Sequence, residues 1–154
     1  MLHLVGIISL IIKCYQINLQ HSKPATDNLV ELIEKEEIDV AFIPEPYTVH
    51  NKVVGITKRY RTFTSSVGRS RTATVVTNNQ MDALLIKEVT DKDTVVVELL
   101  LGNLKFYAAN MYLDITEQPD KTNKLINDIL QLANTSGLLI TMDSNSWSRT
   151  WLTN

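Results

Sequence analysis

The spacing of apolar residues changes twice within the first 43 residues, and this change constrains the fold more than any other feature. Residues 8–19 are rich in isoleucine and leucine without strict alternation, as in a strand buried on both faces. Leu29, Leu32 and Ile33 then recur at helical spacing, and residues 38–43 return to a short apolar run. A strand, a helix and a strand within about 35 residues predict a parallel βαβ unit.

The ends of the expected helix are marked by polar residues. Ser22 and Pro24 start it, and Thr26 or Asp27 is placed to cap its first turn. The helical pattern ends near Glu37. The helix is therefore expected to connect the two strands with little loop on either side.

The middle of the chain has a different character, because β-branched and aromatic runs follow one another between turn residues. Gly102-Asn103 has the form of a two-residue hairpin loop. The pattern predicts an antiparallel meander whose strands are residues 73–77, 83–89, 94–101 and 104–112.

A second helix and strand are expected after Pro119. Apolar residues at helical spacing continue to Ala133 and are closed by Ser136-Gly137. Residues 138–142 then form a short apolar run that we interpret as a buried strand. The order βαβ, meander, αβ predicts a single domain over residues 1–154 in which sheets and helices share one core.

Charge and cysteine content narrow the classes of function. A net charge of −2 and a pI near 5.9 exclude a globally basic nucleic-acid binder, so any polyanion site must be local. Cys14 is the one cysteine, which excludes an internal disulfide and indicates a small buried residue in a reducing compartment. The apolar start lacks a basic region and is too short to span a bilayer, so residues 1–8 are interpreted as a nonstandard extension before a buried strand, and no membrane partner is expected.

Polar residues stand at the ends of the apolar strands, where inner strands of layered α/β proteins carry their site residues. Each of them, taken alone, is also typical of a turn, a helix cap or a packed aromatic ring. Their joint placement favours a site made of Asn18, Glu45, Tyr112, Asp143 and Asn145.

Four segments in order, QINL, IPEPY, NMYLD and MDSNS, followed by Trp151, resemble the endonuclease/exonuclease/phosphatase superfamily. More narrowly, they resemble the apurinic-endonuclease-like domain of non-LTR retrotransposons. The resemblance implies a DNase I-like four-layer α/β sandwich with mixed sheets. It also implies a nuclear, metal-dependent DNA endonuclease that nicks double-stranded target DNA, with a reverse transcriptase encoded downstream in the parent element.

The resemblance assigns a role to each strand-end residue. It implies that Glu45 ligates Mg²⁺ or Mn²⁺ and that Asn18 helps hold the metal site through its side-chain carbonyl. Tyr112 would contact the scissile phosphate, Asp143 would orient or deprotonate the attacking water, and Asn145 would contact the phosphate and the metal site. Mg²⁺ is usually bound by one or two carboxylates and hard oxygen ligands, so these residue types suit it. The three histidines and single cysteine show no spacing typical of zinc ligands.

Two departures from the family pattern affect the expected activity. Met142 and Ser144 occupy the positions where the family usually has glycine and phenylalanine. Family domains also continue through a Ser-Asp-His motif, so the sandwich is expected to be incomplete at its C-terminus and its catalysis impaired. The alternatives are a non-catalytic remnant or nucleic-acid-binding module with the same fold, and a phosphatase acting on a small phosphorylated substrate.

A cationic stretch without acidic residues lies between Thr48 and Arg71. We expect it to form a long loop that contacts DNA phosphates, because clustered cations gain affinity by releasing counterions. A plain solvated surface is the alternative. Arg69 and Arg71 are the first candidates for DNA contacts, followed by Lys58, Arg59 and Arg61.

Overall fold

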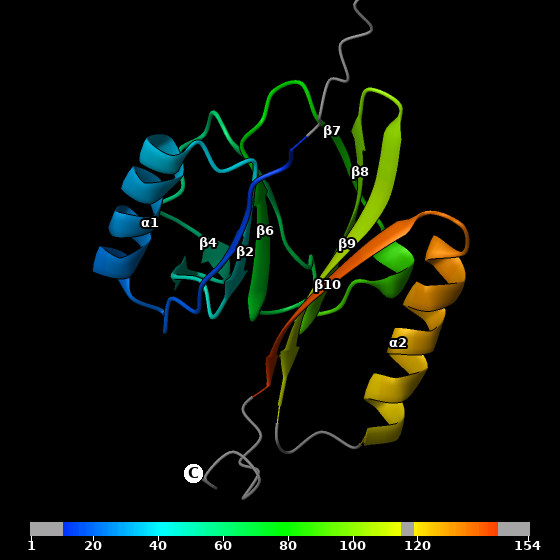
Figure 1. The fold of residues 1–154 in the computed structure, drawn as a ribbon. Helices are drawn as coiled ribbons and strands as arrows, with labels where there is room; N and C mark the ends of the chain where they lie inside the picture. The colour runs from blue at the N-terminus through cyan, green and yellow to red at the C-terminus, as the bar shows by residue number, and fades with distance from the viewer. Residues whose placement is uncertain (1–10, 115–118, 145–154) are drawn as a thin grey trace, which may run out of the picture.

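A computed structural model describes residues 11–114 and 119–144, in which two four-stranded sheets face each other (Figure 1). The first sheet has the order β1 (Cys14–Gln16), β2 (Val40–Pro44), β6 (Thr72–Val76) and β5 (Arg61–Phe63). The second has the order β10 (Gly137–Ser144), β9 (Leu104–Leu113), β8 (Thr94–Leu101) and β7 (Asp82–Leu85). The remaining elements are α1 (Lys23–Glu36), the hairpin strands β3 (Thr48–Val49) and β4 (Lys52–Val53), the 3₁₀ helix η1 (Lys87–Val89) and α2 (Pro119–Ala133).

The alternation of side chains along β2 places the first sheet between two apolar layers. Ala41 and Ile43 pack against Leu29 and Ile33 of α1. Phe42, one residue out of step, is fully buried on the opposite face in a cluster that includes residues of the second sheet. Every residue of β2 is therefore buried, as the continuous apolar run predicts.

The second sheet repeats this arrangement with α2. Val95 and Val97 face the first sheet, whereas Val96 and Ala109 pack against Ile129 of α2. Figure 1 shows α1 and α2 on the outer faces with both sheets between them. The expected four-layer α/β sandwich with mixed sheets is confirmed. Among the described residues, neither helix is long and apolar enough to cross a membrane.

The expected βαβ unit is present. Its helix is capped by Ser22, about one turn before Thr26 and Asp27, which the sequence offered as caps. β1 and β2 pair in parallel across α1. The Ser22 hydroxyl accepts from the Ala25 backbone N–H at 3.3 Å, and Pro24 occupies the first turn, where no N–H donor is needed. Thr26 instead donates its hydroxyl hydrogen to the Ser22 carbonyl at 2.9 Å.

The first strand is an exposed edge strand, so the prediction that it is buried on both faces is wrong. Within residues 11–114 and 119–144, β1 pairs only with β2, and its three residues are all exposed. Cys14 is consequently exposed, contrary to expectation. Partial desolvation of the thiol, and then the negative charge of Asp39, still raise the pKa of Cys14. The nonstandard extension over residues 1–8 lies outside the described residues.

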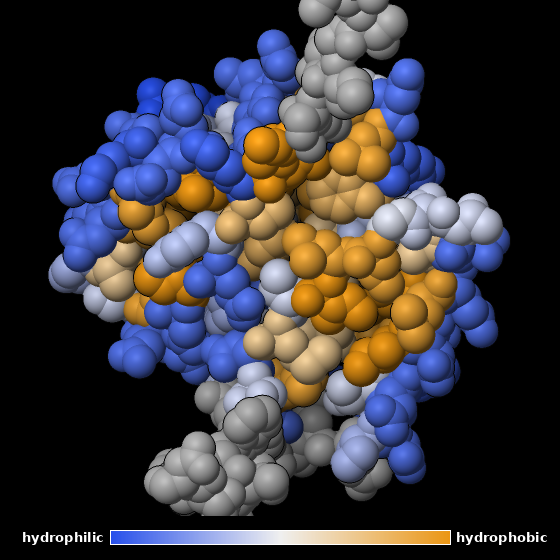
Figure 2. Space-filling view, viewed as in Figure 1, coloured by the Kyte–Doolittle hydropathy of each residue, from blue (hydrophilic) through white to orange (hydrophobic). Residues whose placement is uncertain are grey.

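Two further expectations about strands are corrected. The run at residues 73–77 forms β6, which pairs antiparallel with β2 in the first sheet, so the meander of the second sheet contains only β7, β8 and β9. β10 pairs in parallel with β9 but lies at the edge of its sheet. Figure 2 shows apolar side chains gathered on the face where β10 lies, and Met142 is 40% exposed. β10 is therefore half-exposed rather than buried.

Candidate active site

Two hydrogen bonds between the sheets bring four of the predicted residues together. The Tyr112 hydroxyl donates to Glu45 Oε1 at 3.0 Å, across 67 positions of the chain. Asn18 Nδ2 donates to Asp143 Oδ2 at 2.6 Å, across 125 positions. Because Asp143 and Tyr112 are direct partners in the parallel β9–β10 pair, the two hydrogen bonds lie next to each other. We call Asn18, Glu45, Tyr112 and Asp143 the strand-end cluster; Asn145 and Trp151 lie outside the described residues.

Sheet topology explains why these residues meet. β1 and β2 are parallel, so Asn18 and Glu45, which follow them, lie at the same end of the first sheet. β9 and β10 are also parallel, so Tyr112 and Asp143 lie at one end of the second sheet. Stacking the sheets brings these two ends into contact. The carboxyl ends of parallel strands are where α/β proteins usually place their ligands.

Glu45 is held in an uncommon backbone conformation. Its φ of 47° lies in the left-handed region, which costs a non-glycine residue roughly 1–2 kcal/mol. The Arg71 carbonyl accepts from its N–H at 2.8 Å, and its own carbonyl accepts from the His21 N–H at 2.9 Å. Strain maintained by such contacts at a strand end is typical of functional residues.

Asn18 faces the cluster with its amide nitrogen. Its Oδ1 accepts from the Gln20 backbone N–H at 2.7 Å, which orients Nδ2 toward Asp143. The resemblance implied a role for the side-chain carbonyl in holding the metal site, but in the structure that oxygen already has a backbone donor. The contact that the structure shows is therefore an amide that orients a carboxylate. The metal-holding role of Asn18 stays a prediction.

Arg71, a first candidate for DNA contact, forms two ion pairs in the structure, and its contact with DNA stays a prediction. Its Nε pairs with Asp93, and its Nη1 pairs with Asp114 at 2.6 Å. The guanidinium also lies over the Tyr112 ring, 4.9 Å from the centroid. The hydrogen bond to Asp93 is the main cause of a strongly raised Arg71 pKa, although partial burial opposes it. A guanidinium neutralised by two carboxylates has little net charge left for a phosphate.

The other predicted DNA contacts do not form one patch. The Arg61 guanidinium donates to the backbone carbonyls of Asn78 and Met81, and Arg59 pairs with Glu34 of α1. Both lie beside the start of β2, whereas Glu45 follows the other end of that strand, roughly 13 Å away. Lys58 is exposed and directly precedes Arg59. Arg69 is exposed and lies two residues before Arg71, whose carbonyl accepts from the Glu45 N–H. Among the predicted DNA contacts, it is therefore an exposed cation near Glu45.

The stretch expected as one long loop contains three strands. The hairpin of β3 and β4 and the edge strand β5 occupy parts of residues 48–71. These strands hold the cations on separate elements. The cationic stretch is therefore divided among strands and turns instead of forming one long loop.

The cluster suits a divalent cation by its donor chemistry. Glu45 Oε2 and Asp143 Oδ1 have no hydrogen-bond partner within the described ranges, and both are hard oxygen atoms of the kind that Mg²⁺ prefers. Burial and the hydrogen bond to Glu45 raise the pKa of Tyr112, so the phenol stays protonated and can donate to an anion. No group of three or more His, Cys, Asp or Glu residues suited to a metal ion occurs among residues 11–114 and 119–144.

Three residues around the cluster were not identified from the sequence. His21 fixes the Glu45 turn through its backbone N–H and contacts the Pro46 carbonyl with Nδ1 at 3.1 Å. Asp93 and Asp114 neutralise Arg71. Nothing in the sequence separates Asp93 from a turn residue, whereas Asp114 ends the NMYLD segment two positions after Tyr112.

Comparisons with known proteins support the fold. No protein-family model matches the chain, and neither does any curated protein. The endonuclease domain of TRAS1, a telomere-specific non-LTR retrotransposon, superposes with a TM-score of 0.78 at 22% identity, covering 92% of this chain and 62% of that domain. TDP2 from D. rerio, complexed with a single-strand DNA product, gives 0.61 at 13% identity, with 89% and 62% covered. An endonuclease/exonuclease/phosphatase family protein from Leptotrichia buccalis gives 0.58 at 13% identity, with 88% and 67% covered.

These similarities agree with the suspected superfamily at the level of fold. The chain has the DNase I-like sandwich of nucleases such as the TRAS1 domain. It spans less than two thirds of the length of the TRAS1 and TDP2 structures.

Proposed function

We propose, from this fold and its strand-end cluster, that the protein is a divalent-metal-dependent DNA endonuclease of the non-LTR retrotransposon type. The observation that carries the proposal is the pair of hydrogen bonds that joins Glu45 to Tyr112 and Asp143 to Asn18. Residues expected from the sequence to do the chemistry lie in one small region, although the chain separates them by up to 125 positions. The fold similarity to the TRAS1 endonuclease domain supports the same class.

Each residue of the cluster has a distinct chemical role in this proposal. Glu45 would hold Mg²⁺ or Mn²⁺ through the carboxylate oxygen that Tyr112 leaves open. On substrate binding, the protonated Tyr112 phenol would turn its one hydrogen from Glu45 to an oxygen of the scissile phosphate. Asp143, oriented by Asn18, would accept a proton from the attacking water. When bound, the metal ion would supply a positive charge that polarises the phosphoryl oxygen and stabilises the leaving oxyanion. Asn145 keeps its proposed phosphate and metal-site contact.

Arg71 supports catalysis from behind the reacting groups. Its contact with the Tyr112 ring and its two ion pairs hold the tyrosine in place. The backbone bond from Glu45 N–H to the Arg71 carbonyl links the same residue to the proposed metal ligand. Arg71 is therefore a positioning residue in this proposal, and Arg69 takes over as the first candidate for a DNA phosphate contact.

The partners follow from the proposed chemistry. The substrate would be double-stranded chromosomal DNA in the nucleus, and a reverse transcriptase in the parent element would extend the nicked strand. The family's Ser-Asp-His motif belongs to a part of its domains that this chain does not match. We therefore expect weak activity from the 154-residue chain and stronger activity from a chain extended by that segment.

A plasmid-nicking assay with Mg²⁺ tests the proposal on the 154-residue chain and on the extended chain. Glu45→Gln should reduce nicking by at least two orders of magnitude, because removing the charge removes the proposed metal ligand. Glu31→Gln, an exposed glutamate on α1, is the matched control and should leave nicking unchanged. The hydrolase proposal fails if neither chain nicks DNA, or if both substitutions have the same effect.

A nucleic-acid-binding module with the same fold is the second candidate function. It requires only exposed cations, such as Lys58 and Arg69, and no metal ion. In that case DNA binding would persist in Glu45→Gln, and no chain would nick DNA with any divalent metal. Binding measured in the absence of metal separates the two candidates.

A further inference from the structure

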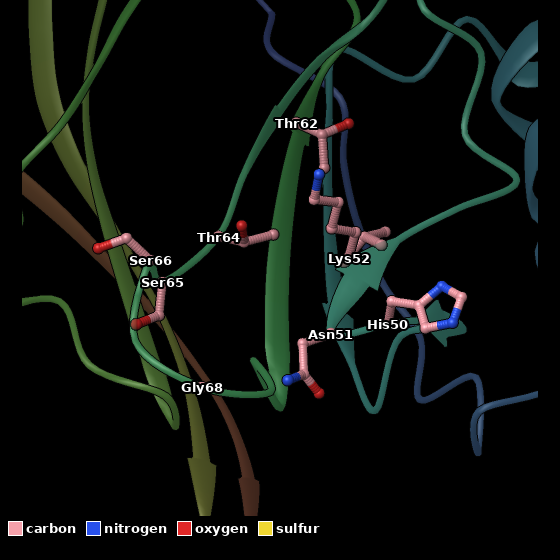
Figure 3. A pocket seen from close by; sticks show the side chains of 9 residues that line it. His50, Asn51, Lys52, Thr62, Thr64, Ser65, Ser66 and Gly68 are labelled. Carbon is pink, nitrogen blue, oxygen red and sulfur yellow. The ribbon is translucent and has the colours of Figure 1, made fainter.

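A polar pocket of about 470 Å³ lies beside the first sheet, apart from the strand-end cluster (Figure 3). The β3–β4 hairpin forms one wall, and β5 with the loop toward β6 forms the other. Figure 3 shows Ser65 and Ser66 on the side of the pocket that faces His50 and Lys52. The pocket shares no residue with the strand-end cluster, so its function must be argued separately.

Among the residues that the structure describes, the lining has cationic and neutral groups but no carboxylate. Lys52 and His50 are its titratable residues. Within the described part of the chain, the Lys52 ammonium has no ion pair or hydrogen bond, so its charge is available to a ligand. Arg69 follows the lining residue Gly68 directly and is also exposed. An electropositive hollow without acidic residues attracts anions.

Hydroxyl groups supply further hydrogen-bond donors. Thr62, Thr64 and Ser66 line the pocket, and their hydroxyls have no partner among the described residues. The Ser65 hydroxyl accepts from the Val67 N–H at 3.1 Å, which leaves its own hydrogen free to donate. Hydroxyls and an ammonium group are the usual protein ligands of phosphate oxygens.

The hairpin fixes Lys52 at the pocket wall. Val49 and Lys52 pair directly, so His50 and Asn51 form a two-residue loop. Their φ values of 49° and 62° are those of a type I′ turn, the turn that matches the twist of paired strands. The base of the Lys52 side chain is thus held by the β3–β4 pair, and only its flexible stem must be ordered when a ligand binds.

We propose that this pocket binds a backbone phosphate of the nucleic acid, as a second contact apart from the strand-end cluster. Its volume lies in the range of pockets that hold a small ligand, about 300–1,000 Å³, and therefore admits a nucleotide unit. Among the described residues its lining has no Phe, Tyr or Trp, and its one ring is the small imidazole of His50, so the sugar-phosphate backbone fits better than a base. The identity of the polymer rests on the proposed function, whereas the affinity for phosphate rests on the pocket alone.

Fluorescence anisotropy with a labelled DNA duplex, in EDTA to prevent cleavage, tests the pocket at several salt concentrations. Each phosphate contact adds about 0.9 to the slope of log affinity against log salt. Lys52→Gln should therefore lower the slope by about 0.9, so that a fourfold rise in salt weakens the wild-type complex about 3.5-fold more than the variant complex. Lys87→Gln removes the same charge from η1, which packs with α2 on the other side of the sandwich, and should leave the slope unchanged.

Thr64→Val separates hydrogen bonding from charge. It removes one hydroxyl and keeps the side-chain shape, so it should weaken binding several-fold without changing the salt slope, because a neutral group releases no counterion. A melt followed by circular dichroism checks that each variant is folded. Because all binding is measured without metal, loss of nicking in Glu45→Gln with unchanged duplex affinity would leave the pocket assignment standing.

Three results would overturn the proposal. One is no duplex binding by the wild-type chain, and another is an equal change of slope in Lys52→Gln and Lys87→Gln. The third comes from amide chemical shifts recorded during titration with inorganic phosphate, a phosphopeptide and the duplex. If only inorganic phosphate or only the phosphopeptide shifts the pocket amides, the ligand is not a nucleic-acid backbone.

Discussion

Replacing Arg71 by methionine should destabilise the fold strongly, because it removes the guanidinium that pairs with the nearly buried Asp93 carboxylate. The Asp93 side chain is 6% exposed, and Arg71 itself is 23% exposed. Removing one partner of a buried ion pair costs about 3–5 kcal/mol, since the remaining charge stays desolvated. Arg71 and Asp114 are partly exposed, so solvent screening reduces the value, and we expect a loss of about 2–4 kcal/mol in the free energy of unfolding.

Urea unfolding measured by circular dichroism gives this free energy for the wild-type chain, Arg71→Met and the control Arg69→Met. Arg69 lies two positions away and is exposed, so its substitution should change the free energy by less than about 0.5 kcal/mol. A double-mutant cycle with Asp93→Asn adds a second criterion. If Arg71 and Asp93 form a pair, the double variant should lose less stability than the sum of the single variants.

Equal stability of the Arg71→Met and Arg69→Met variants would refute the structural role of Arg71. So would strict additivity in the cycle with Asp93. Either result would restore Arg71 as a surface cation, as expected from the sequence. The measurement therefore distinguishes two roles that the sequence alone cannot separate.

Three further predictions concern single contacts. The Tyr112 pKa is higher in the folded protein than its unfolded value near 10, so the protonated phenol contributes its full stabilisation below about pH 10 and less as pH rises through the folded pKa. The difference in unfolding free energy between wild type and Tyr112→Phe should therefore shrink above about pH 10, and a constant difference would contradict this reasoning. Phe42→Ala should cost about 3–5 kcal/mol in urea unfolding, because the ring is fully buried between the sheets, and a loss below about 1 kcal/mol would show that the cluster is misplaced. Ser22→Ala should cost about 1 kcal/mol by removing the α1 cap, whereas Ser136→Ala, a loop control, should cost little.

The site residues could be found from the sequence because each stands at the end of an apolar run. Asn18 and Glu45 follow residues whose spacing predicts parallel strands, and such strands end at one edge. The hydrogen bond between Glu45 and Tyr112 could not be predicted, because it depends on how two separate sheets stack. Local spacing thus located the residues, and only the tertiary structure joined them.

Partners distant in the chain decide exposure and ion pairing. The sequence marks Arg71 as a cation, and only the structure shows that Asp93 and Asp114, 22 and 43 positions away, pair with it. Cys14 looks buried until the order of strands places β1 at an edge. Sequence periodicity carries no information about either partner.

Titration with Mn²⁺, followed by broadening of backbone amide resonances, tests the central claim most directly because it needs no catalytic activity. Mn²⁺ broadens resonances near its binding site, so we predict that residues around Glu45, Tyr112 and Asp143 broaden first and that Glu45→Gln abolishes this broadening. Broadening centred on the exposed glutamates of α1, or broadening around Asp143 that survives Glu45→Gln, would contradict a shared metal site at the strand ends.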